Sequence, residues 1–402
     1  MKFFYRVLQR CLFYISQLLP WREPVVISGE NSLPRLKEKL KQLTFRHYLI
    51  VTDQGIVKAG LLKYLLLQLN DRDISFSVYD QTIPNPTIQN VEDAVRLYHQ
   101  NNCQALIGFG GGSAIDAAKC VGIRIVKPKT PFHQMKGILK VNRSIPYLIA
   151  IPTTAGTGSE TTIAAVISDP ITHEKFAISD LHLMPKLAVL DPLLTENLPP
   201  FYTATTGMDA LTHAVEAFIG HSGTKMTNQK AKHAIHLIHE YLEKSYLNPH
   251  DLEARMQMLE ASYDAGYAFT RAYVGNIHAI AHTFGGFYQI PHGYANAIIM
   301  PHVLSYYGKS VFKSLSSLSD LLKLTEFHAT EDEKSKAFIQ WIESMNQKFN
   351  LPNSIEIIDQ DHVNQMVNHA FHEANPLYPV PMILSKSDFK FLIEKVSVIK
   401  SS

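Results

Sequence analysis

Residues 104–119 read QALIGFGGGSAIDAAK, an apolar run that meets a cluster of glycines and then continues with helical spacing. We interpret the run as a buried strand, the glycines as a turn and the remainder as the start of a helix. Glycines let a backbone approach a ligand closely, and the free N–H groups and dipole of a helix start favour an anion. A tight turn with a purely structural role explains the same residues, so this motif alone is weak evidence for a diphosphate site.

Three further apolar runs end at turn residues in the same way: HYLIVTD (47–53), YLIAIPTT (147–154) and LAVLDP (187–192). The segments 56–69 and 91–101 between them have helical periodicity, and this alternation predicts a largely parallel sheet. Ligands bind such sheets at the carboxyl ends of the strands. IPTTAGTGSE (151–160) is a second polar, glycine-rich turn, and two such turns can hold a dinucleotide from both sides.

After Pro199-Pro200 the sequence changes to long helical patterns, for example at 230–245 and 251–270. Consecutive prolines end regular structure, so we place a domain boundary here. We predict an α/β dinucleotide-binding domain over residues 24–198 and a helical domain over residues 199–402.

Residues 1–23 precede both domains and begin with MKFFYRVLQRCLFYISQLLPW. Arg6 and Arg10 interrupt the apolar run and no small-residue cleavage site follows, so we expect no signal peptide. At helical spacing the apolar residues form one stripe: Phe4, Val7, Leu8, Cys11, Leu12, Ile15, Leu18 and Leu19. This basic amphipathic helix packs against the protein or a second subunit, or it makes a peripheral membrane contact through residues 1–22. We favour packing.

The composition is typical of a globular protein. Apolar residues make up 46% and charged residues 18% of the 402, and the mean hydropathy is -0.05, which excludes a disordered chain and a multi-span membrane protein. The net charge of +2, without a long block of either sign, argues against nucleic acid as a partner. Cys11, Cys103 and Cys120 are widely spaced and form no CxxC, so we expect a cytoplasmic protein without disulfides.

The second half contains the sharpest chemical pattern. TGMDALTHAVEAF (206–218) places Asp209 and His213 four residues apart on one helical face, and NIHAIAHTFGGFYQIPHG (276–293) places His278 and His282 likewise. His292 follows beyond a Gly-Gly pair that we expect to break the helix. One carboxylate and several neutral imidazoles suit Fe(II) or Zn(II), either of which polarises a substrate oxygen as a Lewis acid.

Asp53 ends the run HYLIVTD and precedes a helical segment. A carboxylate at this place accepts hydrogen bonds from a ribose diol and repels a 2′-phosphate, which favours NAD over NADP. An ordinary helix cap explains the aspartate equally well.

In order and spacing, the chain resembles the iron-containing, or group III, alcohol dehydrogenase family. The resemblance rests on GGGSAIDAAK, PTTAGTGSE, the LDP, PP and GMDALTHAVEAF stretch, and HAIAHTFGGFYQIPHG. It runs from about Pro24 to at least His302. It implies a Rossmann-like α/β domain followed by an all-α metal-binding domain, the dehydroquinate synthase-like architecture, with the active site between the two.

The resemblance also implies roles for single residues. The family's metal ligands fall on Asp209, His213, His278 and His292, and its proton-relaying histidine falls on His282. Its dinucleotide contacts fall on Asp53, Asn85, Gly110, Gly111, Gly112, Ser113, Thr153, Thr154, Thr162 and Lys175. Thr283-Phe284 stands where the family commonly has Pro-Leu, a change that bears on the substrate pocket.

The function implied by the resemblance is reversible hydride transfer between an alcohol or aldehyde and NAD(H), with Fe(II) or Zn(II), in a homodimer or larger assembly. One alternative is a NAD- and metal-dependent lyase or cyclase of the dehydroquinate synthase-like type, which needs a basic pocket. Few basic residues lie near the ligand segments, Lys225 and Arg271 being the nearest in sequence. The other alternative, a non-catalytic NAD sensor, has no use for four metal ligands.

Overall fold

The computed structural model describes residues 2–170, 175–357, 359 and 361–399. Its contacts divide the chain into two compact units. The first, which we call the sheet unit, contains Pro20–Pro199 and Pro249–Tyr263. The second, the helical unit, contains Met1–Leu19, Pro200–Asn248 and Asp264–Ser402. The α/β sheet followed by a helical region confirms the fold class expected from the sequence.

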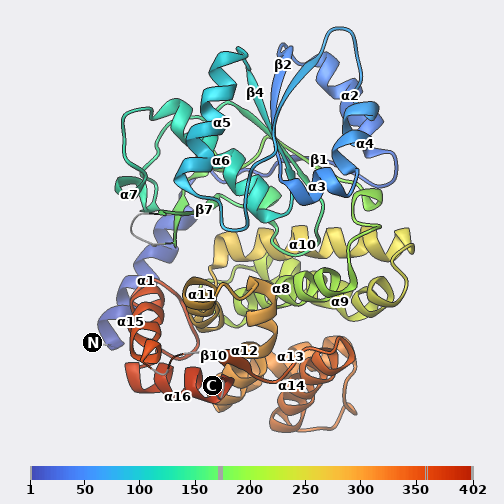
Figure 1. Cartoon of the computed structure of the whole chain (residues 1–402). Helices are drawn as coiled ribbons and strands as arrows, with labels where there is room; N and C mark the ends of the chain where they lie inside the picture. The colour runs from blue at the N-terminus through green and yellow to red at the C-terminus, as the bar shows by residue number, and fades with distance from the viewer. Residues whose placement is uncertain (1, 171–174, 358, 360, 400–402) are drawn as a thin grey trace. The chain divides into compact units, whose positions relative to one another are not determined.

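The sheet unit is built on six parallel strands in the order β1-β9-β6-β4-β2-β3. They are β1 (Val25–Ser28), β2 (His47–Val51), β3 (Ser75–Tyr79), β4 (Ala105–Gly110), β6 (Tyr147–Pro152) and β9 (Leu187–Leu190). Of these, β1, β2 and β4 are labelled in Figure 1. From β2 the chain adds β3 on one side and then β4 on the other, so the strand order reverses between β2 and β4. Open α/β sheets bind ligands at the carboxyl ends of the strands beside such a reversal.

Helices cover both faces of this sheet, because alternate residues of each central strand are apolar on opposite sides. Tyr48 and Ile50 pack into one core cluster with the leucines of α2 (Ser32–Gln42) and α4 (Leu61–Gln68). Leu49 and Val51 pack into the other cluster with α5 (Ile88–Gln100) and α6 (Gly112–Val126). The helix expected at 56–69 is divided into α3 (Gln54–Lys58) and α4, with the break at residues 59–60.

A smaller sheet of β5 (Gly137–Ile138), β8 (Lys175–Ser179) and β7 (Ala164–Ser168) packs beside α6. The sheet unit also contains the short helix α7 (Phe132–Met135) and the 3-10 turns η1 (Ser159–Thr161), η2 (Leu181–Leu183) and η3 (Pro192–Leu194). The buried Lys119 of α6 donates hydrogen bonds from Nζ to the carbonyl oxygens of Thr162 and Ala164, at 3.0 and 2.7 Å. This lysine fixes the start of β7 to α6.

The helical unit contains long helices with one short pair of strands. The helices are α8 (Pro200–Ile219), α9 (Lys225–Leu247), α10 (Leu252–Ala272), α11 (Asn276–Tyr288), α12 (His292–Tyr307), α13 (Phe312–Leu322), α14 (Glu331–Lys348), α15 (His362–Ala374) and α16 (Lys386–Val396). The first part of α10 belongs to the sheet unit. The 3-10 turn η4 (Gly308–Ser310) follows α12, and β10 (Ile355–Ile357) pairs in parallel with β11 (Ser397–Ile399). The expected break at Gly285-Gly286 is wrong: both glycines lie inside α11, which ends where Gln289 adopts φ 55°.

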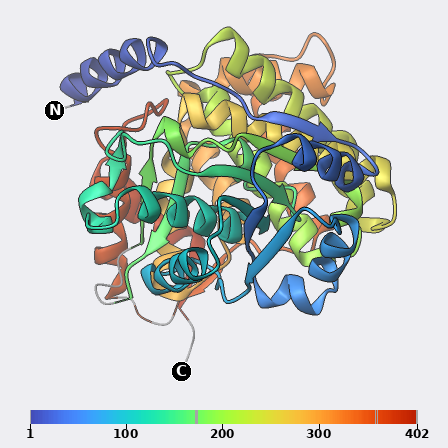
Figure 2. The same cartoon turned by 90° about the horizontal axis from the view of Figure 1, so that it is seen from above.

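The N-terminal helix α1 (Lys2–Gln17) forms, but its contacts differ from those of the predicted stripe (Figure 2, dark blue helix at the end marked N). Its buried side chains are the polar Gln9 and Ser16, whereas Phe4 is 66% exposed and Ile15 56% exposed. The predicted stripe is thus only partly covered, with Leu8 and Leu12 half-buried, and the fully buried positions of α1 are polar. Among the described helices, none has the length and apolar character needed to cross a membrane.

Candidate metal centre and nucleotide-binding turns

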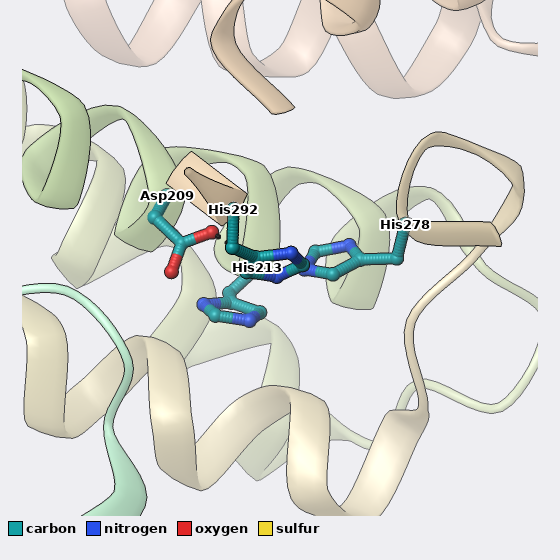
Figure 3. Close-up of side chains that lie close together, drawn as sticks. All are labelled: Asp209, His213, His278 and His292. Carbon is teal, nitrogen blue, oxygen red and sulfur yellow. Dashed lines mark ion pairs between the residues drawn. The ribbon is translucent and has the colours of Figure 1, made fainter. Parts of the chain in front are cut away.

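Three helices, α8, α11 and α12, bring four polar side chains close together (Figure 3). Asp209 and His213 lie one turn apart on α8, His278 lies in the first turn of α11, and His292 is the first residue of α12. One oxygen or nitrogen atom from each of the four lies within 4.8 Å of those of the others. Asp209, His213 and His278 are 2 to 5% exposed. The side chain of His292 is 31% exposed, so the cluster opens on its side.

Close packing of α12 against α8 makes this convergence possible. A Cβ atom at Gly293 would lie 2.2 Å from the carbonyl oxygen of Thr205 and 3.0 Å from the Cβ of Asp209. No other residue type fits there without moving the backbone of α8. The glycine therefore allows His292 to reach the side chains of α8.

Glu216 fixes the orientation of His278. The Nδ1 of His278 lies 2.6 Å from Oε2 of Glu216, which also accepts a hydrogen bond from the N–H of Gly275 at 2.7 Å, while Oε1 accepts one from Ile277 at 2.7 Å. Burial raises the pKa of the Glu216 carboxyl to about 7, although the two backbone N–H groups oppose this shift. Because Nδ1 of His278 is engaged, its Nε2 is left with a lone pair toward the cluster.

Asn296, on α12 one turn after His292, is a member of the site that we did not predict. Its Nδ2 donates to Oδ1 of Asp209 at 2.7 Å and lies 3.2 Å from Nε2 of both His278 and His292. With two hydrogens on Nδ2, Asn296 can donate to Asp209 and to one of the two imidazole nitrogens at a time. The i, i+4 spacing from His292 is the signal that could have revealed this residue.

The donor set fits a borderline divalent cation. One carboxylate and three imidazoles are the ligands that Zn(II) and Fe(II) accept, and the partial exposure of His292 allows a further oxygen ligand to approach. Burial lowers the pKa of His278 well below its usual value, and the nearby His282 acts in the same direction. This imidazole is therefore neutral over the physiological pH range, as metal binding requires.

His282 lies beside this cluster without belonging to it. Its ring stacks on that of His292, with centroids 5.0 Å apart, and its Nδ1 lies 2.6 Å from Oε1 of Glu373 on α15. Burial tends to raise the pKa of Glu373, but the charge and hydrogen bond of His282 and the hydroxyl of Tyr378 lower it below its usual value. Sequence reasoning missed Glu373, which lies 91 residues from His282, and no spacing pattern connects the two.

In the sheet unit, the two glycine-rich turns meet at the carboxyl ends of neighbouring strands. The N–H of Thr153, after β6, donates to the carbonyl oxygen of Gly110, at the end of β4, at 3.0 Å. Gly110 has φ 144°, and a Cβ atom there would lie 2.9 Å from the Cβ of Ala114 and 3.3 Å from Oδ2 of Asp53. Asp53, Gly110 and Thr153 are thus adjacent, and Thr154 follows directly. Gly111 precedes α6, whose first two residues are Gly112 and Ser113.

Asp53 also caps a helix, as the alternative interpretation of its sequence position expects. Its Oδ1 accepts a hydrogen bond from the N–H of Ile56 at 3.0 Å, at the start of α3. Because Oδ2 faces Gly110, the same carboxylate is positioned to contact a ligand at the turn.

The remaining predicted dinucleotide contacts fall into two places. Lys175 donates from Nζ to Oδ1 of Asn85 at 2.7 Å, and the N–H of Asn85 donates to Oγ of Ser113 at 3.4 Å, so these three residues lie together at the start of α6. Thr162 is 3% exposed, and its hydroxyl accepts a hydrogen bond from Lys119 at 2.8 Å. The side chain of Thr162 is therefore engaged in the protein interior with Lys119 of α6, and its predicted contact with the dinucleotide stays a prediction.

Comparison with known families gives the same result for both parts of the chain. Residues 24–192 match the family model described as iron-containing alcohol dehydrogenase, and residues 203–396 match the C-terminal model of the Fe-containing alcohol dehydrogenase family. The chain belongs to this family. It is an oxidoreductase, and the resemblance expected from its motifs is confirmed.

Individual members of the iron-containing alcohol dehydrogenase family are similar over most of the chain. Alcohol dehydrogenase 4 of Schizosaccharomyces pombe is 36% identical over 358 residues, which are 87% of this chain and 83% of the relative. The NAD-dependent methanol dehydrogenase of Bacillus methanolicus is 32% identical over 352 residues, 87% of this chain and 92% of the relative. The solved structure of an alcohol dehydrogenase from Oenococcus oeni has a TM-score of 0.89 at 30% identity, and the match covers 94% of this chain and 99% of that one.

Proposed function

We propose that this protein is a NAD- and metal-dependent alcohol dehydrogenase, in which Asp209, His213, His278 and His292 bind Fe(II) or Zn(II). The observation that carries the proposal is the convergence of these four donors within 4.8 Å, on the helices of a family whose members are named alcohol dehydrogenases. The overall reaction removes a hydride from the carbon of an alcohol and transfers it to NAD, and aldehyde reduction is the reverse.

The bound cation supplies Lewis-acid polarisation of the substrate oxygen. The protein's own residues hold the donors in fixed orientations, since Glu216 holds His278 and Asn296 holds Asp209. The exposed side of His292 admits the substrate, because the other three donors are buried.

His282 is the residue that we propose to move the alcohol's proton. Its Nδ1 is held by Glu373 at 2.6 Å, so Nε2 is the atom left to receive a proton. Its side chain is 30% exposed and its ring stacks on the partly exposed ring of His292, which places it at the open side of the cluster. A proton accepted at Nε2 can therefore leave to solvent.

For the dinucleotide, we propose that the turn Gly110–Ser113 binds the diphosphate and that Asp53 binds the ribose. The first N–H groups of a helix have no acceptor within the helix, so the start of α6 at Gly112 and Ser113, with its positive dipole end, favours the phosphates. Asn85 and Lys175 form a polar pair beside Ser113, and Thr153 and Thr154 border the same turn. Thr162 acts through Lys119, which fixes the adjoining strand.

An Asp53→Asn variant tests the proposed choice of NAD over NADP. Asparagine still accepts the hydrogen bond from Ile56, so the helix cap is retained while the negative charge is lost. We expect the ratio of kcat/KM for NADP to that for NAD to rise about tenfold or more, since removing a like-charge repulsion of about 1.4 kcal/mol is worth a factor of ten. Asp53→Ala, which loses the cap as well, shows how much of the effect is structural. An unchanged ratio in Asp53→Asn would refute the role of Asp53.

The test of the whole proposal uses the protein purified without added metal. Elemental analysis should find stoichiometric Fe or Zn, and a panel of short and long alcohols with NAD should produce NADH. A lyase or cyclase would regenerate NAD in each turnover, so metal-dependent conversion of a substrate without net NADH would replace the proposal with that alternative.

The homodimeric state and the cytoplasmic location also stay predictions, as does the absence of nucleic acid among the partners. The substrate class that we propose is a small alcohol or aldehyde, following the names of the relatives. Size-exclusion chromatography with light scattering checks the dimer.

A further inference from the structure

The loop between α15 and α16 is held by the N-terminal helix. We call residues 376–381 the C-terminal loop. Arg6 of α1 donates to the carbonyl oxygens of Val380 and Pro381, at 2.5 and 2.9 Å. Gln9 donates from Nε2 to two further carbonyl oxygens of the loop, those of residues 376 and 378, at 2.9 and 2.8 Å. Four backbone acceptors of one short loop are therefore bound by two side chains of α1.

The same loop carries a side chain that reaches the site. The hydroxyl of Tyr378 donates to Oε1 of Glu373 at 2.9 Å, and this oxygen is the one that lies 2.6 Å from Nδ1 of His282. Gln9 thus binds the backbone of Tyr378, the hydroxyl of Tyr378 binds Glu373, and Glu373 contacts His282. These contacts connect α1 with His282. All of these residues belong to the helical unit.

Polar side chains make the buried contacts of α1, while the apolar Leu8 and Leu12 are half-buried. Gln9 is 5% exposed although it is polar, whereas Phe4 and Ile15 are 66% and 56% exposed. A buried amide is stable only when its hydrogen bonds are made, so Gln9 specifies one position of the loop relative to α1. The loop has further anchors, since the N–H of His221 donates to the carbonyl oxygen of Pro379 at 2.7 Å.

We propose that Tyr378 and Glu373 are positioning residues for His282, and that α1 holds them in register through Arg6 and Gln9. The proposal rests on the proposed role of His282 as the proton-moving group. Glu373 keeps the imidazole in the tautomer whose Nε2 is free, as a carboxylate does for the histidine in other acid–base pairs. Tyr378 limits Glu373 to one rotamer, and α1 limits Tyr378 by fixing its backbone. The N-terminal segment is therefore part of the support of the active site.

The test compares two variants of α1 in the full-length, metal-loaded protein. Arg6→Ala/Gln9→Ala removes all four bonds to the loop, and Arg10→Ala, an exposed arginine on the same helix, is the matched control. In the double variant we expect faster hydrogen–deuterium exchange across residues 376–381 and a kcat lowered about fivefold or more, which corresponds to the loss of about 1 kcal/mol of positioning. KM for NAD and metal content should stay near the wild-type values, and Arg10→Ala should match the wild type throughout.

Tyr378→Phe separates positioning from general loss of structure. It removes one hydroxyl, retains the ring, and should lower kcat about tenfold without loss of metal. Wild-type exchange across residues 376–381 in the double variant would overturn the anchoring, and wild-type kcat in both the double variant and Tyr378→Phe would overturn the positioning. If the wild-type protein itself formed no NADH with any alcohol, the proposed function would fail. The exchange measurement would then decide the anchoring alone.

Discussion

A His278→Ala variant is expected to lose its bound metal and to oxidise alcohols at least about a thousandfold more slowly than the wild type. The substitution removes one of four donors that converge within 4.8 Å, and a site with three remaining ligands holds a divalent cation far less tightly. It also leaves Glu216, which is 3% exposed, without the imidazole that it holds at 2.6 Å. Losing about 4 kcal/mol of transition-state stabilisation, the contribution typical of a Lewis-acid metal, gives a rate loss of this size.

Elemental analysis and NADH formation are measured on the same preparation of His278→Ala. His236→Ala is the matched control, because His236 is an exposed histidine on α9 and lies outside the cluster. The control should retain both metal and rate. Full activity in a metal-free preparation of His278→Ala would contradict the proposed metal chemistry altogether.

The sequence predicted correctly those strands and helices in which burial determines which positions are apolar. The runs that became β2, β4, β6 and β9 are apolar because both faces of the sheet are covered by helices. The edge strands β1 and β3 were missed. The exposed residues of β1 and the alternating serines of β3 give no continuous apolar run. These segments are strands because they form hydrogen bonds with a neighbouring strand. The residues of the segment alone do not predict this pairing.

The candidate site was predictable where its members share a helix or follow a strand. Asp209 with His213, and His278 with His282, are i, i+4 pairs whose spacing alone places them on one face. Glu373 was missed because it acts across the packing of α11 against α15, which no periodicity encodes. For the same reason, no pattern in the sequence connected Tyr378 with Glu373.

Helix α1 shows that an amphipathic pattern predicts only part of the contacts that a helix makes. Leu8 and Leu12 of its apolar stripe are half-buried, but Phe4 and Ile15 are largely exposed, and Arg6 and Gln9 make the hydrogen bonds to the C-terminal loop. Amphipathic spacing identifies a helix and its apolar face, whereas hydrogen bonds to a distant loop depend on where the loop's carbonyl groups point. The peripheral membrane contact has no support from the described structure, and the exposed face stays without an assigned partner.

A Glu216→Ala variant is expected to weaken metal binding about 10- to 100-fold and to lower the free energy of unfolding by about 3 kcal/mol or more. Glu216 accepts hydrogen bonds from the N–H groups of Gly275 and Ile277 and from Nδ1 of His278. Alanine leaves three buried donors without an acceptor, at a cost of about 1–3 kcal/mol each before relaxation. It also frees His278 to turn, and loss of such an outer partner typically weakens a metal site by this factor.

These two consequences of Glu216→Ala must be measured apart, because a bound metal itself stabilises the folded state. Denaturant unfolding of the chelated protein reports the hydrogen bonds alone, and metal titration of the same protein reports the affinity. Glu216→Gln retains one acceptor oxygen, so it should fall between alanine and the wild type in both measurements. The exposed Glu240 on α9 provides the control, since Glu240→Ala removes a carboxylate without removing an acceptor from the site. Wild-type metal affinity in Glu216→Ala would show that His278 holds its orientation by packing alone.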